Sequence, residues 1–207
     1  ILCDSAVAVP AAPSATTATN AQTLVNVTWT DNSTDEIGFK IYRRLSNETE
    51  ATEIATAVTA SPYSDSTLTE GQTAYYSVAA YNDNGESAKS KVVSATLDSV
   101  KPTVVSTTPV NGGSTTGTTV SINFSESIII KCPASLMTCG GLNPIKLVGA
   151  GNTYYMGSHG FSGSTLSSQP FVDGANPSYT VTIDSDFIYD LNGNKMSQDY
   201  VFTFTDN

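Results

Sequence analysis

The sequence contains few of the groups that carry out chemistry at neutral pH. Its 207 residues include one histidine, three cysteines and one tryptophan, and only 14% are charged, against about 25% in an average soluble domain. An acid–base or nucleophilic site needs a reactive group that is held by a second one. His159 lies in the flexible stretch Gly-Ser-His-Gly, and no nucleophile pattern surrounds any serine. We therefore expect a protein that is not an enzyme and has no catalytic residues.

Basic residues and long apolar runs are also scarce. Nine Lys and Arg stand against nineteen Asp and Glu, which gives a net charge of -10. This charge repels phosphate backbones, so we expect no nucleic-acid partner. No stretch of eighteen apolar residues is present, so we expect no transmembrane segment. Threonine and serine, in contrast, number 29 and 26, which favours an extracellular β protein.

The first half of the chain alternates between apolar and polar residues. Val25, Val27 and Trp29 are separated by polar residues, which is the pattern of a half-buried strand. Further short runs lie at 39–42, 53–58, 75–81 and 91–97, each bounded by turn residues. They predict an antiparallel sandwich of about seven strands. Residues 4–23 are small and polar, so by themselves they suggest a flexible tail.

The same alternation returns after a break at residues 98–102, where Pro102 ends one segment. Strands are expected at 120–124, 179–183 and 200–204, and two shorter ones at 145–148 and 153–156. The fold class is therefore all-β, with two tandem antiparallel β-sandwiches. We expect an extended segment at 1–11, one domain at 12–98 and a second at 99–207. The middle of the second domain, 131–178, is enlarged and contains eight glycines.

Two stretches of the first half carry a family resemblance. Residues 29–43, WTDNSTDEIGFKIYR, and residues 76–87, YSVAAYNDNGES, resemble bacterial fibronectin type III domains. The resemblance covers about residues 12–97 and implies a sandwich without catalysis. In that family a tyrosine usually anchors the corner before this last strand, but the matching position here is Ala74. Tyr75 or Tyr76 then replaces the anchor, or the corner is absent.

Four short motifs of the second half also carry a resemblance, and they lie at 102–109, 120–126, 190–194 and 202–204. Their order and spacing resemble those of the bacterial Ig-like family first described in S-layer proteins. The resemblance implies an Ig-like sandwich on the surface of a bacterium. The 131–178 region departs from the family pattern, so we expect the properties that distinguish this chain from other family members to lie there.

The three cysteines suggest one disulfide. Cys132 and Cys139 are separated by six residues that include Pro133, a spacing that suits a short loop closed in an oxidising compartment. Cys3 is then left over. It is a candidate for an intermolecular disulfide or for lipid attachment, and a free thiol is the third alternative.

Two groups of residues suggest ligands. Oxygen-bearing side chains at Asp184, Asp186, Asp190, Asn192 and Asn194 offer the kind of ligand that Ca²⁺ prefers, although a structural turn explains the same residues. No other cofactor is expected.

Aromatic residues in the enlarged region suggest a platform on which a sugar stacks. They are interleaved with Gly and Ser, and a small satellite core is the alternative explanation for them. The glycan-binding candidates are Tyr154, Tyr155, Phe161 and Phe171.

The N-terminal segment suggests self-assembly. An extended strand can add to an exposed sheet edge of a neighbouring molecule or of its own domain. Here the candidate residues are Ser5, Ala6, Val7, Ala8 and Val9.

We therefore expect an extracellular structural protein of the bacterial cell surface that assembles with copies of itself, or with other surface proteins, into a filament or layer. The main alternative is an adhesive or carbohydrate-binding module that uses 131–178, and a weaker one is an accessory piece of a larger secreted enzyme.

Overall fold

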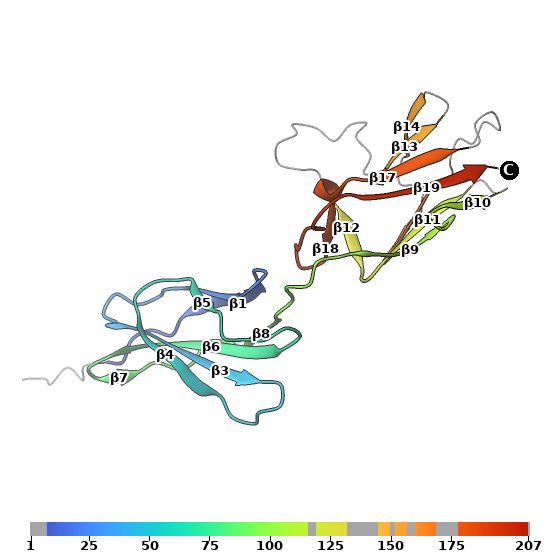
Figure 1. The fold of residues 1–207 in the computed structure, drawn as a ribbon. Helices are drawn as coiled ribbons and strands as arrows, with labels where there is room; N and C mark the ends of the chain where they lie inside the picture. The colour runs from blue at the N-terminus through green and yellow to red at the C-terminus, as the bar shows by residue number, and fades with distance from the viewer. Residues whose placement is uncertain are drawn as a thin grey trace, which may run out of the picture. The chain divides into compact units, whose positions relative to one another are not determined.

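The described residues form two units built almost entirely of β-strands (Figure 1). The computed structural model describes residues 8–115, 119–131, 145–149, 152–156, 160–168 and 178–206. The chain divides into the units Ile1–Ser99 and Val100–Asn207. The predicted all-β class, with multiple antiparallel sheets, is confirmed.

The first unit contains two sheets in which every pairing is antiparallel. One sheet has the order β1-β2-β5, and the other has the order β4-β3-β6-β7, with β8 also paired to β6. The strands of the first sheet are β1 (Ser14–Asn20), β2 (Val25–Thr30) and β5 (Tyr63–Asp65). Those of the second are β3 (Gly38–Leu45), β4 (Thr52–Val58), β6 (Thr73–Asn82), β7 (Gly85–Glu86) and β8 (Val93–Thr96).

The core of the first unit lies between these two sheets. From β2, the side chains of Val25, Val27 and Trp29 are buried, as their alternation predicts. They pack in one cluster with residues of β3 and β6. The rings of Trp29 and Phe39 have their centroids 5.1 Å apart. Burial of such aromatic and branched side chains supplies about 1.5–3 kcal/mol each, which makes this core the main source of stability of the unit.

Strand β1 was not expected from the sequence, which suggests a tail over residues 4–23. Its backbone pairs with β2 from Ser14↔Thr30 to Asn20↔Val25. Its side chains are exposed or at most half-buried, so no apolar alternation marks it. The strand forms because the buried backbone groups of β2 need partners on this side.

A buried carboxylate joins the two sheets of the first unit. Asp65, on β5, is fully buried. It accepts hydrogen bonds from Nη1 of Arg43 at 2.7 Å and from the hydroxyl of Tyr76 at 2.8 Å. It also accepts from the backbone N–H and the hydroxyl of Thr67, at 3.0 and 2.6 Å. Arg43 and Tyr76 lie on β3 and β6 of the opposite sheet, so Asp65 ties one sheet to the other.

The contact with Asp65 also shows which tyrosine replaces the anchor that is missing at Ala74. Tyr76 is fully buried, and its hydroxyl is the one that reaches across the core. Tyr75, on the other face of β6, is half-buried under the guanidinium of Arg44, which lies 4.2 Å from its ring centroid. Tyr76 is therefore the tyrosine that anchors this part of the sandwich.

The described residues of the second unit form three sheets. The five-stranded sheet has the order β10-β19-β17-β13-β14, the four-stranded sheet the order β15-β16-β11-β9, and β12 pairs with β18. All pairings are antiparallel except that of β10 with β19, which is parallel. The strands of the large sheet are β10 (Gly113–Thr115), β13 (Ile145–Gly149), β14 (Asn152–Met156), β17 (Tyr179–Ile183) and β19 (Tyr200–Asp206). The others are β9 (Val104–Thr108), β11 (Val120–Phe124), β12 (Ile128–Ile130), β15 (Gly160–Ser162), β16 (Thr165–Ser168) and β18 (Ile188–Asp190), with the short helix η1 (Ser185–Phe187).

The core of the second unit includes part of the enlarged region. Strand β13 pairs with β14 on one side and with β17 on the other. Its residues Ile145 and Leu147 are fully buried in the same cluster as Ile122, Val181 and Phe202. The region 131–178 is therefore more than a surface insertion, because it supplies an inner strand of the large sheet.

We predict that Tyr76→Phe destabilises the first unit by about 1–3 kcal/mol, because the change leaves a buried carboxylate with one hydrogen bond fewer. Urea unfolding followed by tryptophan fluorescence measures this, since Trp29 lies in the same core. The neighbouring Tyr75→Phe is the matched control and is expected to change the free energy by less than about 0.5 kcal/mol. Equal losses in both variants would show that the Asp65 contact contributes nothing.

We also predict that this contact makes the first unit sensitive to acid. Burial alone would raise the pKa of Asp65, but the hydrogen bonds from Thr67, Arg43 and Tyr76 lower it below its usual value. A lowered folded-state pKa gives stability that is present above the unfolded pKa, about 3.9, and is lost as pH falls through the folded value. The difference in unfolding free energy between wild type and Tyr76→Phe should therefore shrink as the pH falls from about 5 through the folded-state pKa of Asp65. A difference that stays constant over this range contradicts the assignment.

Candidate functional site

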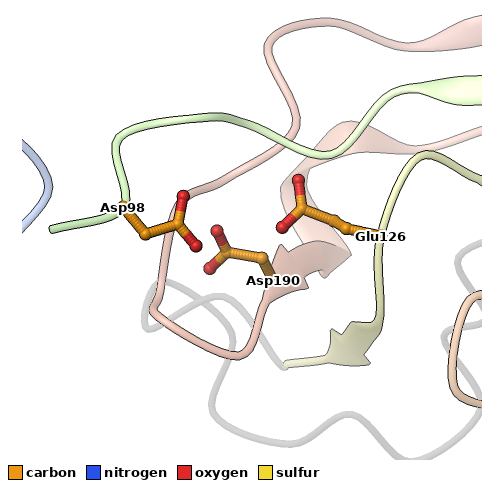
Figure 2. Close-up of side chains that lie close together, drawn as sticks. All are labelled: Asp98, Glu126 and Asp190. Carbon is orange, nitrogen blue, oxygen red and sulfur yellow. The ribbon is translucent and has the colours of Figure 1, made fainter. Parts of the chain in front are cut away.

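Two acidic residues of the second unit lie close together near the end of β18. Figure 2 shows Asp190 and Glu126, and a carboxylate oxygen of each lies within 4.8 Å of the other. Both residues belong to the second unit. Sequence reasoning missed Glu126. The signal for Glu126 is its position two residues after the end of β11, in the motif that resembles the Ig-like family.

Asp190 closes a turn with its own neighbours. Its Oδ1 accepts hydrogen bonds from the backbone N–H groups of Asn192 and Asn194, both at 2.8 Å. Its Oδ2 accepts from the side-chain amide of Asn194 at 2.6 Å. Asp190 and Asn194 are almost fully buried, and Gly193 in the turn has a φ of 91°, which favours glycine. These contacts use both oxygens to hold the chain, as aspartate does in many turns.

The other members of the predicted calcium set lie on the preceding helix. Asp184 accepts a hydrogen bond from the backbone N–H of Asp186 at 2.9 Å and so caps η1. The carboxylate of Asp186 pairs with the exposed ammonium of Lys195 at 2.5 Å. The structure therefore divides the five residues between a helix cap and a turn. Calcium binding by them stays a prediction.

The aromatic candidates for glycan binding fall on different elements. Tyr154 and Tyr155 lie on β14 of the five-stranded sheet, and Phe161 lies on β15 of the four-stranded sheet. Phe171 lies outside the described residues. Tyr155 is 55% exposed. Of the predicted platform, Tyr155 is thus the member that the structure shows on the surface.

Several other predicted residues lie outside the described part of the chain. These are Cys3, Cys132, Cys139 and His159, together with Ser5, Ala6 and Val7. Of the N-terminal segment, Ala8 and Val9 are described and exposed. The carbonyl of Ala8 accepts a hydrogen bond from the side chain of Asn82 at 3.3 Å. Val9 lies beside Gly85, where an added Cβ would meet its Cγ1 at 3.1 Å.

The outer face of the second sheet of the first unit carries a network that sequence reasoning missed. The hydroxyl of Tyr42 donates to both carboxylate oxygens of Glu86, at 2.7 and 2.8 Å. Lys40 lies 3.3 Å from both Glu53 and Glu86, and the ammonium of Lys89 sits 3.4 Å from the centroid of the Tyr42 ring. Burial and the Glu86 carboxylate raise the pKa of Tyr42 to about 12. Tyr42 therefore stays protonated at neutral pH, and the network is suited to stabilising the sheet.

A hollow of about 190 Å³ lies beside the first strand of the second unit. Its titratable lining residues are Asp199 and Tyr200. Asp199 accepts hydrogen bonds from the backbone N–H and the hydroxyl of Ser185, both at 2.9 Å, so its carboxylate holds the chain in place. The remaining lining residues are Pro102, Thr103, Val104, Met196, Ser197 and Gln198. This composition lacks the paired acid and base that hydrolysis requires.

Among the helices of the described residues, none has the length and apolar character needed to cross a membrane.

Comparison with known proteins places the second half in a family. The model of the bacterial Ig-like domain (Big_5) matches residues 98–206, which is more than half of the chain. This match confirms the predicted Ig-like resemblance. No curated protein matches the chain. Domains of this kind and fibronectin type III domains are typically non-catalytic binding or structural modules, and the bacterial Ig-like domain is typical of surface proteins.

Solved structures that match the chain include fibronectin type III domains. A Fn3-like protein from Clostridium thermocellum is 25% identical, with 41% of this chain and 90% of that one covered and a TM-score of 0.38. A beta-1,2-glucanase from Parabacteroides distasonis is 27% identical over 44% of this chain and 14% of the glucanase, with a TM-score of 0.37. The chicken CNTN1 FN1-FN3 domains are 14% identical over 96% of this chain and 67% of that one, with a TM-score of 0.39.

These TM-scores are below 0.5, so no functional conclusion is drawn from the solved structures. The first unit has its own evidence in its strand order, three strands facing a second sheet, and this order agrees with the predicted fibronectin type III resemblance. Through residues 98–206, the chain belongs to the bacterial Ig-like domain family.

Proposed function

We propose that this chain is a non-catalytic structural segment of a bacterial cell-surface protein, located outside the cell, and that its N-terminal segment joins it to further copies of itself. The observation that carries the proposal is that each unit has its own closed apolar core, while its buried carboxylates hold the chain together. Asp65 ties two sheets and Asp190 closes a turn. Units of this kind are suited to a structural role, in which they space and connect other parts of a surface protein.

The self-assembly part rests on the segment before β1. Pro10 and Pro13 are buried, whereas Ala8 and Val9 are exposed. A segment with valines at the alternate positions 7 and 9 can pair with the edge strand of a neighbouring copy. In the first unit, β4 forms one end of the second sheet and offers such an edge. A contact of this head-to-tail type does not close on itself and produces a filament.

The test is electron microscopy with size-exclusion chromatography of the full chain and of a variant that lacks residues 1–9. The truncation ends before Pro10, because Pro10, Pro13 and β1 belong to the folded unit. We expect regular polymers from the full chain and monomers from the truncated one. A monodisperse monomer in both samples contradicts self-assembly.

A double variant separates strand pairing from loss of length. Val7→Asp with Val9→Asp places two charges on one face of the segment, since alternate residues share a face, and should abolish the polymers. Val105→Asp with Val110→Asp makes the same change at two exposed valines of the second unit and should leave them intact. Equal loss in both double variants would point to net charge as the cause, and so against pairing through the segment.

A further inference from the structure

The outer side of the five-stranded sheet forms a surface that we call the threonine face. Along β13, β17 and β19, Leu147, Val181 and Phe202 point into the core. The residues on either side of them alternate outward. The threonine face consists of Thr153 and Tyr155 from β14, Lys146 and Val148 from β13, Thr180 and Thr182 from β17, and Val201 and Thr203 from β19.

Strand register arranges these side chains in two rows across four strands, which Figure 1 shows next to one another in the second unit. One row runs Tyr155–Lys146–Thr182–Val201, and the other runs Thr153–Val148–Thr180–Thr203. Directly opposed residues in an antiparallel pair have Cβ atoms about 4.5–5.5 Å apart. Tyr155 and Lys146 are therefore cross-strand neighbours at one end of a set of threonine and valine side chains.

The face is exposed and lacks negative charge. Tyr155 is 55% exposed, Val201 53% and Val148 36%. Residues 100–207 contain seven Asp and Glu against four Lys, yet none of the eight residues of the face is acidic and one, Lys146, is basic. A negatively charged ligand on this face would therefore meet a cation and, among the eight residues of the face, no carboxylate.

We propose that the threonine face binds an acidic polysaccharide strand. The apolar side of a sugar ring would stack on Tyr155, as aromatic side chains with a polar tip allow. A uronate carboxylate would accept a charge-assisted hydrogen bond from Lys146, and the threonine hydroxyls, which both donate and accept, would pair with sugar hydroxyls. A glycan fits the face better than a nucleic acid, because the face offers one cation, Lys146, whereas a phosphate backbone presents closely spaced charges along its whole length.

The proposal refines the sequence prediction of a glycan site in the enlarged region. It keeps Tyr155, moves the site from the loops to a sheet surface, and adds residues of β17 and β19 that lie far away in the sequence. It does not depend on self-assembly, because the face lies in the second unit and excludes residues 1–9.

The first test is calorimetric titration of the full chain with three acidic oligosaccharides, of galacturonate, guluronate and hyaluronan, and with neutral cellotetraose. We expect binding of at least one acidic probe, weakened by added salt, and a preference of about tenfold over cellotetraose. The proposal is overturned if none of the three acidic probes binds, or if cellotetraose binds more tightly than they do.

The second test uses two variants of the face and two matched controls. Tyr155→Ala should weaken binding about tenfold or more, and Lys146→Gln should remove the preference for acidic probes. The controls are Tyr189→Ala and Lys131→Gln, which alter another tyrosine and lysine of the same unit. These two residues are also neighbours, since the ammonium of Lys131 lies 5.2 Å from the centroid of the Tyr189 ring. Neither control should change binding, and thermal melting should show all four variants folded.

Two results of this second test overturn the proposal. One is an equal effect of the face and control variants, which would mean that binding is general. The other is a change in oligomeric state on Tyr155→Ala, measured by sedimentation without any sugar, which would assign the face to contact between copies of the chain.

Discussion

The buried carboxylate of Asp65 is the contact on which the arrangement of the first unit depends. A carboxylate inside an apolar core is costly unless its oxygens are hydrogen-bonded. Here the partners come from both sheets, so the charge is satisfied only when β5 lies opposite β3 and β6 at the observed register. Slipping a strand by one residue would turn its side chains to the other face and leave the charge without partners. The contact thus selects one packing among the many that an apolar core alone would allow.

The second unit uses aspartate for a related purpose. Asp190 is buried at the end of β18 and holds the following turn through three N–H groups. This turn leads towards β19, an inner strand of the large sheet that lies between β10 and β17. The same sheet presents two different faces, since apolar side chains point inward while threonines, Lys146 and Tyr155 point outward. The two-residue period of these strands therefore places apolar side chains in the core and polar ones on the surface to which we assign ligand binding.

Much of the fold could be predicted, because alternation of apolar and polar residues is a local property. Val25 to Trp29, Val120 to Phe124 and Tyr179 to Ile183 lie in strands as expected. Strand β1 could not be predicted in this way, because its side chains contribute little to the core. The network of Tyr42 with Glu86 joins residues 44 positions apart, and such pairing leaves no local pattern.

The sequence by itself determined the class of the protein: an acidic chain of two β-sandwiches. Composition and period are sufficient for this, since they depend on residue type and near neighbours, and the motifs of the second half carry the resemblance to the bacterial Ig-like domain family. Tertiary structure decided which polar residues act together. It brings the hydroxyl of Tyr76 to Asp65 and makes Tyr155 the cross-strand neighbour of Lys146. It also divides the predicted calcium ligands between a helix cap and a turn. These pairings follow from strand register, which is fixed when the sheets pack and cannot be read from one strand alone.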